Sequence, residues 1–190
     1  GMFHSGSEKA LVSFFQAVSA MTTLGFSSVN FSALKALPLL IIAATMFIGA
    51  SPSGTGGGVK TTTVSAIFAF LKSKLGGQKN VTIGVHRLPS YRVDSAVSYV
   101  IIFHLILFVA VSILLCSDNF SFADTAFEAI SAFGASGLST GITPMFSVLG
   151  KSVLLVLMLL GRFDVILLGS FMFVKLKEYS GQNIKANIAL

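Results

Sequence analysis

FQAVSAMTTLGFS, at residues 15–27, returns 112 residues later as FEAISAFGASGLS, at residues 127–139. Six of the 13 paired positions are identical, and among them Gly25 pairs with Gly137. A repeat that continues from a short polar loop into a long apolar run indicates two copies of one structural unit. In membrane transport proteins, the transport site lies where such copies meet. The same offset aligns residues near the ends of the two apolar runs that follow: Met46 with Met158, and Gly49 with Gly161.

The composition indicates a membrane protein. The 190 residues are 54% hydrophobic and 11% charged, with a mean hydropathy of +0.87, whereas a soluble domain carries about 25% charged residues. The net charge of +6 could suit nucleic acid, but the basic residues gather in two segments, 72–92 and 175–185. By the positive-inside rule both segments lie in the cytoplasm. We therefore expect a multi-pass protein of the cell membrane, in contact with the lipid bilayer, with a cytoplasmic C-terminus and no nucleic-acid partner.

The hydrophobic pattern predicts an all-α integral membrane fold with three spans and two short re-entrant helices. Residues 93–116 are apolar throughout and long enough to cross the bilayer alone. The first span is broken at residues 49–58, and such a break is tolerated only where protein or water covers it. Both long repeat helices run from outside to inside, so the repeats are parallel. The remaining predicted segments are the short helices 8–22 and 124–133, the halves 35–48 and 59–73 of the broken span, and the last apolar run, 145–176.

Each short helix leads into a loop that suits a cation filter. The C-terminal end of a helix carries partial negative charge, and loop carbonyl oxygens can replace the water shell of an ion. Glycine permits backbone dihedrals that a Cβ would forbid. The alternative is that the glycines only form turns. The candidate filter residues, whose backbone carbonyls would bind the cation, are Thr23, Leu24, Gly25, Phe26, Ala135, Ser136, Gly137 and Leu138.

These segments resemble the Trk/Ktr/HKT superfamily of bacterial, fungal and plant potassium transporters, and the resemblance covers essentially the whole chain. Members carry four successive units of a first helix (M1), a pore loop and a second helix (M2) around one pore. SAFGASGLSTGITP (131–144) resembles the fourth pore loop, and MFIGASPSGTGGGVKTTT (46–63) resembles the gating segment of the third M2 helix. LMLLGRFDVI (157–166) is similar to the fourth M2 helix with its pore arginine. The resemblance implies uptake of potassium, in some members with or instead of sodium.

The same resemblance implies a domain organisation. Residues 1–72 are a third-type unit that lacks M1, 73–92 a basic cytoplasmic loop, 93–178 a fourth-type unit and 179–190 a cytoplasmic tail. We expect Gly1 to be the cut end of a longer chain, although a natural half-length protein is the alternative. Two units cannot close a fourfold pore, so the other half comes from the same gene product or from a second chain. The family also implies a cytoplasmic nucleotide-binding regulatory subunit.

The resemblance makes the glycine-rich break an intramembrane gate below the filter, with Arg162 as an electrostatic barrier. Residues 54–61 nearly match a phosphate-binding loop motif, but Val59 replaces the glycine that should precede the lysine. A nucleotide site is therefore not expected here. A helix kink without gating, and a structural ion pair of Arg162 with Asp164, are the alternatives. The implied gate residues are Gly54, Gly56, Gly57, Gly58, Lys60 and Arg162.

Three positions depart from the family pattern, and the first two of them bear on ion selectivity. Leu24 precedes the first filter glycine where a small residue is usual, Ala135 and Ser136 replace a common threonine–valine pair, and Asp164 follows Arg162 by two. On the outer side, acidic residues such as Glu128 would either attract cations or be ordinary solvated groups.

We therefore expect a channel-like potassium pathway. An ion-coupled secondary transporter with Na+ as substrate or co-ion, and a non-transporting membrane subunit, remain alternatives. The sequence contains no clustered metal ligands and no nucleophile with a plausible base. Neither an enzyme nor a bound cofactor is expected, and K+, or Na+, is the transported ion.

Overall fold

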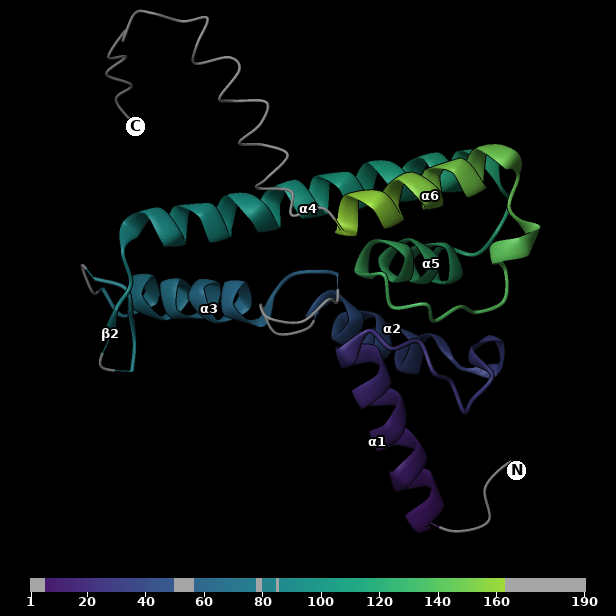
Figure 1. Cartoon of the computed structure of the whole chain (residues 1–190), viewed down its shortest axis with the longest axis horizontal. Helices are drawn as coiled ribbons and strands as arrows, with labels where there is room; N and C mark the ends of the chain where they lie inside the picture. Colours follow the sequence, from purple (N-terminus) through teal and green to yellow (C-terminus); the bar gives the residue numbers. More distant parts are fainter. Residues whose placement is uncertain (1–5, 50–56, 78–79, 85, 163–190) are drawn as a thin grey trace, which may run out of the picture.

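A computed structural model describes residues 6–49, 57–77, 80–84 and 86–162, and these form a mostly helical structure (Figure 1). Two gate candidates, Gly54 and Gly56, and the candidate arginine partner Asp164 lie outside the described residues. The helices are α1 (Gly6–Thr22), α2 (Ala36–Phe47), α3 (Thr61–Leu75), α4 (Ser90–Ser117), α5 (Phe122–Gly134) and α6 (Val148–Arg162), with short 3-10 helices η1 (Phe31–Ala33) and η2 (Thr143–Met145).

The structure repeats with the same offset as the sequence. α1, η1 and α2 correspond to α5, η2 and α6, and the two 3-10 helices begin at Phe31 and Thr143, which are 112 residues apart. α1 and α5 end at Thr22 and Gly134, again one offset apart. The identical spacing of the helix ends means that both copies fold as the same local unit.

The longest element, α4, extends the predicted span 93–116 by three residues at its start. Its 28 residues give a length of about 42 Å, which exceeds the ~30 Å hydrocarbon core of a bilayer. Among the described residues, it is the one helix both long and apolar enough to cross a membrane. Figure 1 shows α3 along the first half of α4 and α6 along the second half. α4, the first helix of the second unit, therefore packs against helices of both units.

Aromatic side chains join α4 to both repeats. The ring of Phe103 on α4 makes edge contacts with Phe47 of α2, at a centroid distance of 4.7 Å, and with Phe133 of α5, at 4.1 Å. Phe103 and Phe133 are almost completely buried. A second cluster joins the repeats directly, because Phe31 and Phe127 pack with centroids 5.5 Å apart. These contacts fix the position of α5 between α2 and α4.

Ser121 caps the start of α5. The Ser121 hydroxyl accepts a hydrogen bond from the backbone N–H of Asp124 at 3.2 Å and donates to its carboxylate at 2.7 Å. This satisfies one of the unpaired N–H groups at the first turn of the helix.

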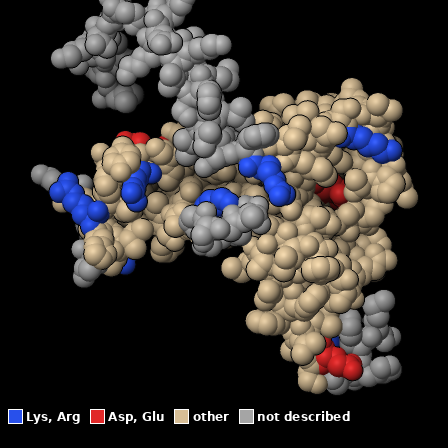
Figure 2. Space-filling model, viewed as in Figure 1, with Lys and Arg blue, Asp and Glu red and all other residues tan. Residues whose placement is uncertain are grey.

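The basic segment 73–92 contains more structure than the expected loop. α3 continues to Leu75, a two-stranded hairpin pairs β1 (Thr82–Ile83) with β2 (His86–Arg87), and α4 begins at Ser90. Figure 2 shows blue basic side chains at this end of the molecule, while most of the visible face is uncharged. The sequence pattern missed the hairpin because its strands are only two residues long.

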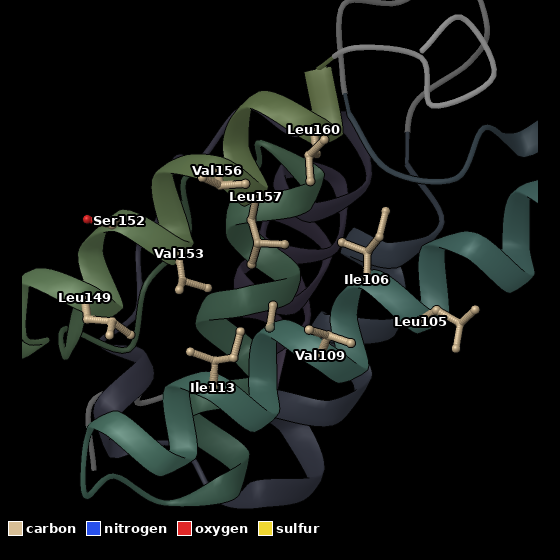
Figure 3. Close-up of a pocket in the computed structure, with 11 residues that line it drawn as sticks. Leu105, Ile106, Val109, Ile113, Leu149, Ser152, Val153, Val156, Leu157 and Leu160 are labelled. Carbon is tan, nitrogen blue, oxygen red and sulfur yellow. The ribbon is translucent and has the colours of Figure 1, made fainter. Parts of the chain in front are cut away.

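An apolar groove of about 490 Å³ runs between α4 and α6 (Figure 3). Its walls are aliphatic, with Ile106 and Val109 on one side and Val153 and Val156 on the other, and Ser152 is the one polar side chain in its lining. A surface of this kind is matched by lipid hydrocarbon or by another apolar helix.

Gly161 offers a test of the packing between α6 and α5, because a Cβ at this position would overlap the carbonyl oxygen of Phe133. Alanine favours a helix over glycine by about 1 kcal/mol, but here we expect Gly161→Ala to destabilise the protein by about 1–3 kcal/mol through overpacking. The measurement is thermal unfolding of the full-length protein in detergent. Gly6→Ala, on α1 with no neighbouring atom within 4 Å, is the control and should not lower stability. Equal or greater stability of Gly161→Ala would contradict the close packing.

Candidate functional site

The two candidate filter loops meet in the structure. A Cβ added to Gly25 would lie 2.6 Å from the carbonyl oxygen of Ser136 and 3.3 Å from the Cα of Gly137. Both glycines adopt positive φ angles, +77° at Gly25 and +75° at Gly137. Only glycine takes such a conformation without strain, so these positions exclude a side chain both by conformation and, at Gly25, by space.

The backbones of the two loops have the same form. Thr23 and Ala135, which directly follow α1 and α5, have φ angles of 55° and 49°. This left-handed turn closes each helix, and the next N–H then bonds back to a serine carbonyl. Leu24 donates to Ser19 at 3.2 Å, and Ser136 donates to Ser131 at 3.1 Å. Two non-glycine residues at equivalent strained positions indicate that this turn belongs to the repeated unit.

A serine on each short helix fixes the far end of its loop. The hydroxyl of Ser19 donates to the Phe26 carbonyl at 2.7 Å, and the hydroxyl of Ser131 donates to the Leu138 carbonyl. These two carbonyl oxygens are thus held by their own helices. The candidate ion ligands without such a bond to the helix are the carbonyls of residues 23–25 and 135–137. Ser19 and Ser131 are identical at one repeat offset, but sequence identity alone does not show that a serine hydroxyl binds the loop.

The loops differ in what covers them. Ser136 and Leu138 are 1% and 2% exposed, whereas the equivalent Leu24 and Phe26 are 62% and 65% exposed. The second loop is covered by α2, where the Met46 sulfur accepts a bond of 2.8 Å from the Ser136 hydroxyl. The described residues contain no helix in the equivalent place beside the first loop.

The described part of the candidate gate segment packs against the C-terminal end of α5, next to the second candidate filter loop. A Cβ on Gly57 would lie 2.7 Å from the Gly134 carbonyl oxygen, at the C-terminal end of α5. The chain then turns at Gly58, whose φ is +79° and whose carbonyl accepts a bond of 3.4 Å from the Tyr99 hydroxyl. Val59 donates to Phe47 at 3.1 Å, and Lys60 precedes α3 as its N-terminal cap residue. The described residues on the two sides of the break, Phe47 and Val59, are therefore hydrogen-bonded to each other, and Gly57 lies against the end of α5.

Arg162 is exposed and ends the described part of α6. Its neighbour Gly161 lies against the carbonyl of Phe133. Gly57 and Gly161 therefore reach the same end of α5, which brings the gate segment and Arg162 to the region below the second filter loop. The alternative pairing of Arg162 with Asp164 involves a residue outside the described ranges.

Within the described residues there is no group of three or more metal-ligating side chains. The ion ligands that this geometry offers are backbone carbonyls. Their field is supplemented by the partial negative charge at the ends of α1 and α5.

Known proteins agree with this architecture. The chain is 35% identical over 159 residues to the Ktr system potassium uptake protein D of Bacillus subtilis, covering 82% of this chain and 34% of the relative. It is 34% identical over 152 residues to the Ktr system potassium uptake protein B of Vibrio alginolyticus, covering 80% of this chain and 33% of the relative. The chain therefore spans about a third of the length of these relatives.

The fold also matches a solved structure. The crystal structure of the potassium transporter TrkH from Vibrio parahaemolyticus superposes with a TM-score of 0.70 at 22% sequence identity, over 87% of this chain and 38% of that one. This likeness establishes a helical membrane fold. The family model described as TrkH, cation transport protein, matches residues 3–178. The chain therefore belongs to the TrkH family of cation transport proteins, which are membrane transporters.

Proposed function

We propose that this chain forms half of a potassium pathway whose filter is lined by the carbonyl oxygens of residues 23–25 and 135–137. The observation that carries the proposal is the meeting of Gly25 and Gly137 in two loops with matched backbone conformations. Carbonyl oxygens held at short spacing replace the hydration shell of K+ as the ion enters. A relative, the potassium/sodium uptake protein NtpJ of Enterococcus hirae, is 26% identical over 172 residues, so Na+ is the alternative ion.

Below the filter, the gate segment and Arg162 would control passage. Gly57 lies directly against the end of α5, so a small displacement of the segment changes the space below the second loop. A fixed positive charge at Arg162 would repel a cation that leaves the filter, and charged residues within membrane proteins usually face a cavity or a partner. In this arrangement α4 crosses the bilayer, the segment 73–92 is cytoplasmic, and the C-terminus is cytoplasmic.

The remaining half of the pore would fill the groove between α1 and α2. Leu37, Ile41 and Thr45 of α2 line this groove. They precede by one repeat offset the α6 residues Leu149, Val153 and Leu157, which face α4. The groove thus has the position that a helix like α4 occupies in the second repeat. Such a helix, and the further units, would come from the same gene product or from a second chain.

A cytoplasmic nucleotide-binding subunit would dock on the basic end of the molecule. Lys72 and Lys74 end α3, and Arg87 lies in the adjoining hairpin. Complementary charge of this kind guides association and orientation of partners.

The filter is tested by Gly25→Ser and Gly137→Ser in the full-length protein, expressed in cells that lack their own potassium uptake systems. We expect both to reduce potassium uptake or its selectivity over sodium by tenfold or more, because a side chain at either glycine would displace the carbonyl oxygens that bind the ion. A tenfold loss corresponds to about 1.4 kcal/mol of ion-binding free energy. Gly25→Ser should be the more severe, because its side chain meets the Ser136 carbonyl.

Gly141→Ser is the matched control for the filter variants. Gly141 has a φ of +95° and no neighbour within 4 Å of an added Cβ, so it imposes similar backbone strain outside the filter. Potassium-selective uptake that survives both filter substitutions would contradict the filter. It would favour an ion-coupled transporter with another ion path, or a non-transporting subunit.

The barrier role of Arg162 predicts that Arg162→Ala raises the rate of ion flux, because the repulsion of cations below the filter is removed. Flux of 86Rb+ into proteoliposomes at matched protein content is the measurement. Lys151→Ala removes an exposed positive charge from the first turn of α6 and serves as the control. A well-folded Arg162→Ala protein with unchanged flux would contradict the barrier.

Coverage of the groove between α1 and α2 predicts low lipid contact at Ile41 in the full-length protein. A spin label at Ile41→Cys, in a Cys116→Ser background, should collide with dissolved oxygen several-fold less often than a label at Phe108→Cys, since Phe108 is 72% exposed on α4. Electron paramagnetic resonance in lipid bilayers measures these collisions. Equal collision rates would show that the groove faces lipid.

A further inference from the structure

Glu128, which the sequence left open as a cation-attracting or solvated acid, is only 4% exposed in the structure. Its Oε1 accepts hydrogen bonds from the Ser139 hydroxyl at 2.6 Å, the Thr140 backbone N–H at 2.8 Å and the Thr140 hydroxyl at 3.1 Å. Its Oε2 accepts from the Thr143 hydroxyl at 2.6 Å. A buried carboxylate with four donors is fully satisfied, so its place is inside the loop and not at an ion entrance.

The first repeat has an equivalent side chain at Gln16, one offset before Glu128, and it is 5% exposed. The backbone N–H of Ser28 can only donate, so the amide oxygen of Gln16 must face it. In that orientation the oxygen accepts from the Ser28 N–H at 2.7 Å, the Ser28 hydroxyl at 3.1 Å and the Val29 N–H at 3.2 Å. Ser28 is the counterpart of Thr140. The same backbone N–H is therefore bound from the same helix position in both repeats.

Glu128 and Gln16 differ in the number of acceptor oxygens, and the groups around them differ accordingly. Glu128 has a second acceptor oxygen, and the Thr143 hydroxyl supplies its donor. Gln16 has no second acceptor, and the counterpart of Thr143 is Phe31, which has no hydroxyl. Phe31 instead packs on Phe127. Each side chain thus has the donor set that its chemistry requires.

We propose that Glu128 and Gln16 are positioning residues that hold the outer end of each filter loop, and that they act as hydrogen-bond acceptors and not as charges. The inference deepens the proposed function and rests on it. Ser131 binds the carbonyl of Leu138, and Glu128 binds the N–H of Thr140 only two residues later. The loop leaves α5 at Ala135, so the ion-facing carbonyls of residues 135–137 lie between fixed points. Loss of the Glu128 anchor would let these carbonyls move and weaken discrimination between ions of different size.

The test compares Glu128→Leu with Glu128→Gln in the full-length protein. Leucine keeps the approximate volume but leaves the Thr140 N–H buried without an acceptor, whereas glutamine supplies the acceptor that Gln16 supplies in the first repeat. We expect Glu128→Leu to lower the ratio of K+ to Na+ uptake about tenfold, on the scale of one buried N–H group left without an acceptor. Glu128→Gln should stay within about twofold of the wild type, since its acceptor is retained. Gln16→Leu should resemble Glu128→Leu.

A measurement without ions separates this inference from the proposed function. Hydrogen exchange of the Thr140 amide should be about tenfold faster in Glu128→Leu and nearly unchanged in Glu128→Gln, because the amide loses its acceptor only in the former. Leu114→Ala, a fully buried α4 residue outside the loop, controls for general loss of stability. It should lower the unfolding temperature without changing the uptake ratio.

The possible results separate the positioning role of Glu128 from the proposed function. An equal loss of selectivity in Glu128→Gln and Glu128→Leu would assign the role to the charge and overturn the positioning role. An unchanged uptake ratio in Glu128→Leu, with a selective wild type, would also overturn it. Absence of selective uptake in the wild type would overturn the proposed function, and the exchange rate of the Thr140 amide would still decide whether Glu128 fixes the loop.

Discussion

Backbone-to-backbone packing at the C-terminal end of α5 is the constraint on which the rest of the arrangement depends. Gly57 approaches the carbonyl of Gly134, and Gly161 approaches the carbonyl of Phe133. Neither contact has space for a Cβ. Small residues allow main chains in membranes to approach closely and to gain dispersion energy without hydrophobic driving force. One helix end thereby holds the described part of the candidate gate segment, the described end of α6 and the second candidate filter loop in one place.

The two repeats show how one local fold acquires two environments. Phe127 is 1% exposed because η1 and α2 of the first repeat cover it, whereas its counterpart Phe15 is half-exposed. The same difference separates Met46, which is fully buried against Ser136, from Met158, which is half-exposed. In the proposed pathway, further units of the same kind would cover these exposed positions of the first repeat and of α6. This pattern agrees with a chain that spans a third of its relatives.

Hydrogen bonds from helix side chains to the following loop fix each candidate filter loop more firmly than an ordinary turn. A glycine turn needs only a permissive backbone. Here Ser19 and Ser131 bind carbonyl groups, while Gln16 and Glu128 bind N–H groups, all in the equivalent order. Buried polar groups of an irregular backbone need partners within the protein, and these side chains supply them while leaving three carbonyls per loop unbound to the helix.

Much of this protein follows from the sequence by itself. The repeat, the unbroken span and the glycine turns were predictable, as were the bounds of α1 to α5 and the start of α6 within about three residues. Hydrophobic period, capping residues and positive φ are local properties. The predicted end of the last apolar run, at residue 176, lies outside the described residues. The close approach of Gly25 and Gly137 was predicted only as a consequence of the repeat and the family resemblance. Which of two equivalent side chains is buried, and that Glu128 serves as an internal acceptor and not as an outer charge, was decided by the tertiary structure. Burial and partner choice depend on groups distant in the chain, which a local pattern does not specify.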